Sequence, residues 1–151
     1  MRSPPPTLNL FDAPEREFCV VRRSRTTTPL QALALLHDPT YVAAARHFAE
    51  RILTHGGATT DERIEFAFRT ASARKPTAAE QKVLHNYFEQ QLAAFGANPA
   101  AAAKSLKVGE SPRNEKLIIA EHAAWMALAR MILNLDETIT KGERKVQCPR
   151  V

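Results

Sequence analysis

The densest group of charged side chains lies near the start of this chain of 151 residues, where acids and arginines are close neighbours. The acids are Asp12, Glu15 and Glu17, and the arginines are Arg16, Arg22, Arg23 and Arg25. A guanidinium group binds phosphate, sulfate or carboxylate through two parallel hydrogen bonds, so these arginines are candidate contacts for an anion or a partner protein. Because the acids are so near in sequence, we expect them to neutralise part of the cluster in structural salt bridges.

A second pair of acids, Asp136 and Glu137, lies at the end of the last predicted helix. Negative charge there is unfavourable because it faces the negative end of the helix dipole. We therefore expect these acids to form structural salt bridges as well. The arginines between residues 22 and 25 are candidate partners, and such pairing would tie the two ends of the domain together.

The same acids support a second interpretation, in which the chain contributes to the active site of an extracellular polymer-degrading enzyme. Glycoside hydrolases use two carboxyl groups that flank the bond to be cleaved. The candidate acids are Asp12, Glu15, Glu17, Asp136 and Glu137. The sequence contains no GxSxG, P-loop or GxGxxG motif, so we assign no catalytic residue and favour a non-catalytic protein.

The histidines and cysteines do not form a pattern typical of a cofactor site. The histidines are His37, His47, His55, His85 and His122. No two of them are four residues apart, and HExxH and CxxC motifs are absent, so we predict no metal site and place each histidine at the surface or at a helix end. Cys19 and Cys148 lie at opposite ends of the chain and could pair only if the fold brought both ends together, so we expect free thiols. No CxxCH block is present, so we expect no cofactor in this chain.

The chain is basic, with a formal charge of +5 and a sequence pI near 9.6. The excess of lysine and arginine lies at its two ends. A third interpretation is therefore nucleic-acid binding, with the basic ends contacting the phosphate backbone. Few aromatic residues accompany the arginines and no helix-turn-helix pattern is present, so we rank this interpretation last.

The predicted fold is all-α, a single compact bundle of five or six helices with an irregular N-terminal arm. Start and stop signals predict helices over residues 29–36, 39–53, 60–71, 78–95, 99–106 and 114–135. Thr28 with Gln31 and Thr77 with Glu80 fit capping boxes. We expect Leu30, Leu33 and Leu36 to form the apolar face of the first helix, and the last helix to lie at the centre because it is apolar over most of its circumference.

The domain organisation follows from these signals. We expect an irregular proline-rich arm over 1–17, a helical domain over 18–140 and a polar basic tail over 141–151. Residues 18–22 form the one short run with strand character, and Gly56 and Gly96 are expected to end helices. No apolar run is long enough to span a membrane, and residues 1–10 lack the apolar core of a secretory signal.

Several short segments together resemble one family. They read FDAP at 11–14, RRSRT at 22–26, TPLQAL at 28–33, LLHDP at 35–39, AFR at 67–69, RKPT at 74–77 and NLDE at 134–137. With these motifs the chain resembles, over about residues 9 to 140, the C-terminal domain of uncharacterised secreted planctomycete proteins, whose larger members also carry cytochrome-c-like modules. His37 departs from the family pattern, which usually has asparagine at that position.

The resemblance implies a role but no reaction. It implies that the chain is the C-terminal part of a larger exported protein, periplasmic or cell-surface, whereas a standalone product without a signal peptide would be cytoplasmic. Its partner would be the upstream domain or a separate chain, in larger members one that contains haem c. We therefore expect a non-catalytic helical module with an exposed apolar patch where that partner packs.

Overall fold

The computed structural model describes residues 10–11, 28–109 and 111–139, and in this part of the chain every regular element is an α-helix. In chain order the helices are α2 (Pro29–His37), α3 (Pro39–His55), α4 (Thr60–Ser72), α5 (Ala78–Ala97), α6 (Pro99–Leu106), α7 (Ile119–Leu133) and α8 (Asp136–Ile139). The predicted all-α fold is confirmed. The predicted arm over 1–17, the strand-like run 18–22 and the tail 141–151 lie outside the described residues, apart from Leu10 and Phe11.

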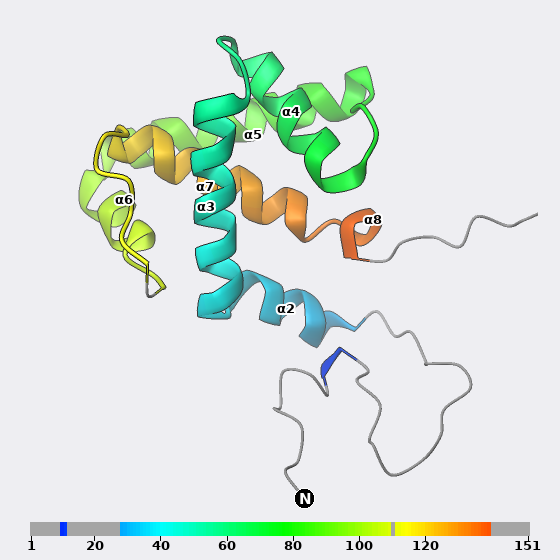
Figure 1. Ribbon diagram of the computed structural model, residues 1–151, viewed down its shortest axis with the longest axis horizontal. Helices are drawn as coiled ribbons and strands as arrows, with labels where there is room; N and C mark the ends of the chain where they lie inside the picture. Colours follow the sequence, from blue (N-terminus) through cyan, green and yellow to red (C-terminus); the bar gives the residue numbers. More distant parts are fainter. Residues whose placement is uncertain (1–9, 12–27, 110, 140–151) are drawn as a thin grey trace, which may run out of the picture.

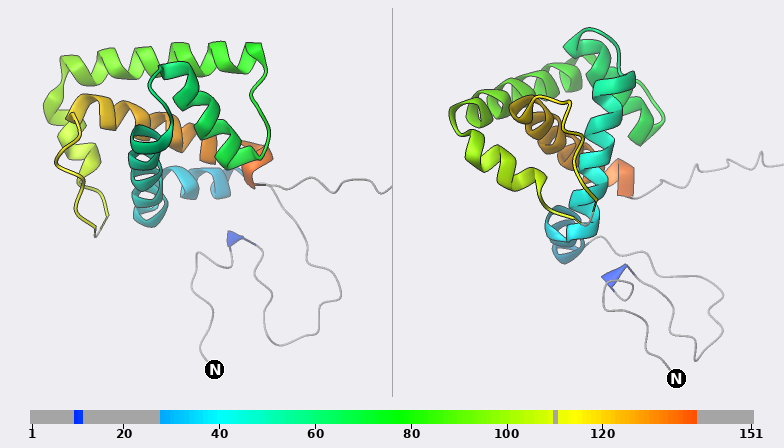
Figure 2. Two further views of the ribbon diagram at one scale, coloured as in Figure 1. Left: turned by 45° about the horizontal axis from the view of Figure 1, so that its top comes forward. Right: turned by 60° about the vertical axis from the view of Figure 1, so that its left-hand side comes forward.

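Helix α7 lies at the centre of the bundle, as its sequence predicts. It packs between α5 and α3, and it also contacts α2, α4 and α6 (Figures 1 and 2). Trp125 is fully buried, and its ring lies 4.4 Å from the ring of Phe88 on α5. Tightly packed alanines such as Ala124 and Ala129, both without exposed surface, let the neighbouring helices approach closely.

The predicted helix starts are confirmed because they depend on local chemistry. Thr28 and Thr77 both form complete capping boxes. The threonine hydroxyl accepts from a backbone N–H of the first turn, and the side chain of the third helical residue accepts from the threonine N–H. Asp38 and Asn98 cap α3 and α6 through their side chains, each followed by proline at the first helical position. Helix α4 begins at Thr60, as predicted, and Thr59 is its N-cap.

Two helices, α5 and α7, have bounds that differ from prediction. Helix α5 runs through Gly96 to Ala97, because a helical glycine can be tolerated and Pro99 then ends the helix. The last helix is shorter than 114–135. It begins at Ile119, after an irregular segment in which the Asn114 side chain accepts from the Lys116 N–H, and it ends before Asn134.

This early end reverses the dipole argument for the last two candidate acids. Asp136 and Glu137 lie in the first turn of the separate short helix α8. Negative charge is favourable at a helix N-terminus. The expectation of acids at a helix C-terminus was therefore wrong.

Candidate functional site

Helix α2 exposes part of its predicted apolar face to solvent. Its sequence, PLQALALLH, contains four leucines and two alanines and no Asp, Glu, Lys or Arg. Yet Leu30 is 59% exposed and Leu33 is 51% exposed. Leu30 and Leu33 of the predicted apolar face are thus exposed, and together they form what we call the α2 face.

The residue of α2 that is buried is its glutamine. Gln31 is 4% exposed, and it caps the helix by accepting from the Thr28 N–H at 3.0 Å. Its Nε2 donates to the carbonyl oxygen of Leu10 at 2.7 Å, while the next residue, Phe11, packs its ring edge-on against Tyr41 of α3. At the other end of α2, the Arg130 guanidinium of α7 donates to the Leu36 carbonyl. Polar contacts therefore fix the orientation of α2 and leave Leu30 and Leu33 exposed.

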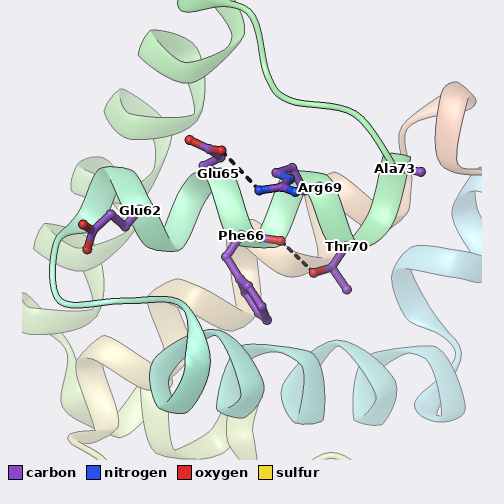
Figure 3. Close-up of a pocket in the computed structure, with 6 residues that line it drawn as sticks. All are labelled: Glu62, Glu65, Phe66, Arg69, Thr70 and Ala73. Carbon is purple, nitrogen blue, oxygen red and sulfur yellow. Dashed lines mark hydrogen bonds and ion pairs between the residues drawn. The ribbon is translucent and has the colours of Figure 1, made fainter.

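A shallow groove of about 560 Å³ follows the outer face of α4. Its lining residues recur at helical spacing and are Glu62, Glu65, Phe66, Arg69, Thr70 and Ala73 (Figure 3). Glu62 caps the helix by accepting from the N–H groups of Ala58 and Thr59, and these bonds lower its pKa. Glu65 forms ion pairs with Arg69 and with Lys75. Both carboxylates of the groove therefore have structural roles.

Arg74 joins three elements at one end of the bundle. Its guanidinium donates to both carboxylate oxygens of Glu80 at 2.7 and 2.9 Å, and to both oxygens of Glu137 at 2.6 and 2.7 Å. It also lies 4.8 Å from the centre of the Phe68 ring. Hydrogen bonding to Arg74 lowers the pKa of Glu137, and with the Thr77 bonds it lowers the pKa of Glu80 to about 2. This arrangement keeps both acids ionised and attaches α8 to α4 and α5.

A buried arginine on α3 holds the irregular segment that precedes α7. Arg46 is 1% exposed, and its guanidinium donates to the carbonyl oxygens of Leu106 at 3.0 Å, Val108 at 3.3 Å and Ser111 at 2.7 Å. One turn further along α3, Glu50 Oε1 accepts from the backbone N–H of Asn114 at 3.1 Å. The segment thus runs along one stripe of α3.

Close packing completes this attachment. Gly109 has a φ of +102°, and a Cβ placed there would lie 2.7 Å from the Cβ of Ala43. Only glycine adopts this positive φ without strain and also leaves room for the side chain of Ala43. We call residues 107–109 and 111–114, held by Ala43, Arg46 and Glu50, the α3 strap.

His122 lies beneath this polar stripe. It has no exposed surface, and its Nε2 is 3.4 Å from the Arg46 carbonyl oxygen and 3.8 Å from Glu50 Oε1. Burial lowers the pKa of His122. The expectation that each histidine lies at the surface or at a helix end was therefore wrong for this one.

The sequence comparison identifies the family. Residues 1–88 match the family described as a protein of unknown function (DUF1553, PSD1). The chain belongs to this DUF1553 family. No curated protein and no solved structure matches it.

The DUF1553 match and the core overlap only in part. The matched residues include α2, α3, α4 and about half of α5, and they end at Phe88, whose ring packs on Trp125 of α7. The central helix therefore follows the matched region, so in this DUF1553 chain the matched helices complete their core with α7.

Most residues predicted to form a site lie outside the described part of the chain. These are Arg16, Arg22, Arg23 and Arg25, together with Asp12, Glu15 and Glu17. The described candidates are Asp136 and Glu137, both exposed on α8. Glu137 pairs with Arg74, a partner that the sequence analysis did not name, and neither acid lines the α4 groove. Cys19 and Cys148 also lie outside the described residues.

The residues that sequence reasoning missed are Gln31 as an anchor, Arg46, Arg74 and His122. An arginine on a helix usually lies on the solvent-exposed face, so the position of Arg46 in the sequence does not indicate that it is buried. Within the described residues, no three His, Cys, Asp or Glu side chains are grouped to hold a metal ion, and no helix is long and apolar enough to cross a membrane.

Proposed function

We propose that this chain is a non-catalytic helical module, the C-terminal part of a larger exported multidomain protein, and that the α2 face packs against the upstream domain of that protein. The upstream part would be of the planctomycete type, in some members haem-c-containing. The observation that supports this proposal is that α2 buries its glutamine and exposes Leu30 and Leu33. Polar contacts hold this helix in place while its two leucines face outward, and neighbouring exposed apolar residues of this kind are suited to pack against another apolar surface.

The chemistry of the α2 face specifies the kind of partner. The two leucines are three residues apart, so they lie on the same side of the helix. Other exposed large apolar residues, such as Val83 on α5 and Ile118 before α7, are single, and single exposed apolar residues are common on protein surfaces. Because α2 carries no Lys or Arg, its face suits an apolar protein surface better than a phosphate backbone.

Co-purification of two separate polypeptides tests the proposal. The chain would be expressed together with the upstream region of a longer DUF1553 protein, and the affinity measured by titration. Burying a leucine contributes about 1.5–3 kcal/mol, so the double variant Leu30→Lys and Leu33→Lys should bind at least about tenfold more weakly. Val83→Lys, at a similarly exposed apolar residue on α5, is the matched control.

The outcomes separate clearly. If the double variant binds with the same affinity as the unaltered chain, the α2 face is not part of the interface. Equal loss in Val83→Lys would point to a general effect of added charge. Visible absorbance of covalent haem in the co-purified partner would establish the haem-c-containing type, and a colourless partner that still requires the leucines would support the interface without haem.

A further inference from the structure

The α3 strap is attached at two charged residues of α3, and one of them lies next to a buried histidine. Glu50 Oε1 accepts from the Asn114 N–H at 3.1 Å and lies 3.8 Å from His122 Nε2. The other oxygen of Glu50, Oε2, is 3.1 Å from His47 Nδ1. The carboxylate therefore stands between the strap on one side and the histidine of the central helix on the other.

The groups around His122 indicate which ring nitrogen carries the proton when the side chain is neutral. Both groups near Nε2 are acceptors, the Arg46 carbonyl and the Glu50 carboxylate, so we assign the proton to Nε2. Nδ1 is buried and has no hydrogen-bond partner. A second proton would therefore place a donor at Nδ1 where the described structure offers it no acceptor.

The charged groups around His122 come from the two elements that cover it. Glu50 and Arg46 face it from α3, and Arg113 faces it from the strap. His47 borders both α3 groups, with its Nδ1 3.1 Å from Glu50 Oε2 and its Nε2 3.5 Å from Arg46 Nη2. Burial and the two arginines lower the pKa of His122, while the Arg46 carbonyl and Glu50 oppose them. A positive charge on this ring is thus disfavoured as long as the strap stays attached.

We propose that the α3 strap is a pH-dependent attachment, which leaves α3 when His122 gains a proton. The imidazolium attracts Glu50 Oε1 more strongly than the neutral Asn114 N–H does, because its full positive charge adds Coulomb attraction to the hydrogen bond. Glu50 then turns from the strap to His122. Repulsion from the new charge acts on Arg113 in the same direction.

Apart from the Arg46 hydrogen bonds and the packing of Gly109 on Ala43, most of the strap has few buried contacts. Lys107, Val108, Gly109, Ser111 and Pro112 are all exposed. Local opening is easiest in segments with few buried apolar contacts. Release would uncover the stripe of α3 that carries Ala43, Arg46 and Glu50, a polar surface distinct from the α2 face.

The direction with pH follows from proton linkage. In the released state Glu50 pairs with the imidazolium, so the pKa of His122 there is at or above its ordinary value of about 6.5, whereas the attached state holds it lower. Below about pH 6.5 the released state binds more protons, so its population rises by up to about tenfold for each pH unit. At neutral pH the strap is expected to stay attached.

Hydrogen exchange of the whole chain tests the proposal. Protection of the Asn114 amide, corrected for the intrinsic exchange rate, would be compared at about pH 7.5 and about pH 5. We expect a loss of protection of roughly tenfold or more at the lower pH. The amides of Leu84 and Phe88, buried in α5, should keep their protection, which separates release of the strap from unfolding.

Variants identify the titrating group. His122→Gln should abolish the pH dependence, whereas His85→Gln, at the surface, should retain it. If His122→Gln fails to fold, Glu50→Gln provides the test. Without the carboxylate, the pH at which the strap is released should be lower. Unchanged protection of Asn114 between the two pH values, or a midpoint that Glu50→Gln does not move, would overturn the proposal.

Discussion

Helices α2 and α7 are both rich in apolar residues, yet they bury opposite kinds of side chain. Helix α7 buries Trp125 and Leu128 completely, and its polar residue His122 is enclosed with them. Helix α2 buries Gln31 and leaves Leu30 and Leu33 outside. The difference arises because α7 is surrounded by other helices, whereas α2 is oriented by hydrogen bonds at its two ends. Apolar composition therefore does not by itself determine burial.

The largest expected effect tests this contrast directly. Leu128→Ala in α7 removes a fully buried side chain and should lower the free energy of unfolding by about 2–5 kcal/mol. Leu33→Ala in α2 should change it by less than about 0.5 kcal/mol, because the side chain is half exposed. Denaturant titration of both variants measures the two values. Similar losses in both would mean that the α2 leucines are buried in solution, and the contrast would be lost.

The second prediction concerns how α2 is attached. Gln31→Ala removes one half of the capping box and the bond to the Leu10 carbonyl, and should lower stability by about 1–2 kcal/mol. The loss should appear as faster amide exchange in α2 with unchanged protection in α7, because α7 has its own core. Gln90→Ala, at an exposed glutamine of α5, controls for the substitution itself. Equal loss of protection in both helices would show that they unfold together.

The sequence predicts the helix starts well because each start depends on a few neighbouring residues. Thr28 with Gln31 and Asp38 with Pro39 are complete signals within four positions, and both produce the expected caps. The central position of α7 also follows from the sequence, since a helix that is apolar all round must be enclosed.

The orientation of α2 and the polar residues inside the bundle could not be predicted in the same way. Leucines at positions 30 and 33 define one face of a helix, but the spacing does not say whether that face meets the core. Arg46 depends on carbonyl oxygens of Leu106 and Ser111, about sixty residues away, and His122 on α3. These contacts form only when the helices pack together, so they cannot be predicted from a local sequence pattern.

A smaller effect on stability is expected from a change in backbone conformation alone. Ala73 ends α4 with φ 62° and ψ 15°, the left-handed conformation that disfavours side chains. Ala73→Gly relieves this strain but gives the unfolded chain more freedom, so a net gain of about 0.5–1 kcal/mol in the free energy of unfolding is expected. Ala93→Gly, on the exposed side of α5, should lower stability by a similar amount. Denaturation midpoints of the two variants should therefore move in opposite directions.

The smallest expected effect compares the buried histidine of α7 with a histidine at the surface. His85 Nδ1 lies 3.1 Å from Asp61 and its Nε2 lies 3.2 Å from Glu89, and bonding to Asp61, supported by Glu89, raises the pKa of His85. A raised pKa means that the folded state binds the proton more tightly, so the contribution to stability is present below the ordinary pKa and is lost as pH rises through the raised one.

His85→Gln should therefore lower stability at about pH 5.5 and have almost no effect at about pH 9, a dependence of opposite sign to that of His122. Because His85 is partly exposed, solvent screening limits its effect to a few tenths of a kcal/mol. Thermal denaturation across this pH range, with and without added salt, measures it, and salt should reduce the difference because it screens exposed charges. A loss of stability that grows with pH would mean that Asp61 and Glu89 do not hold the proton on His85, and the contrast between buried and exposed histidines would fail.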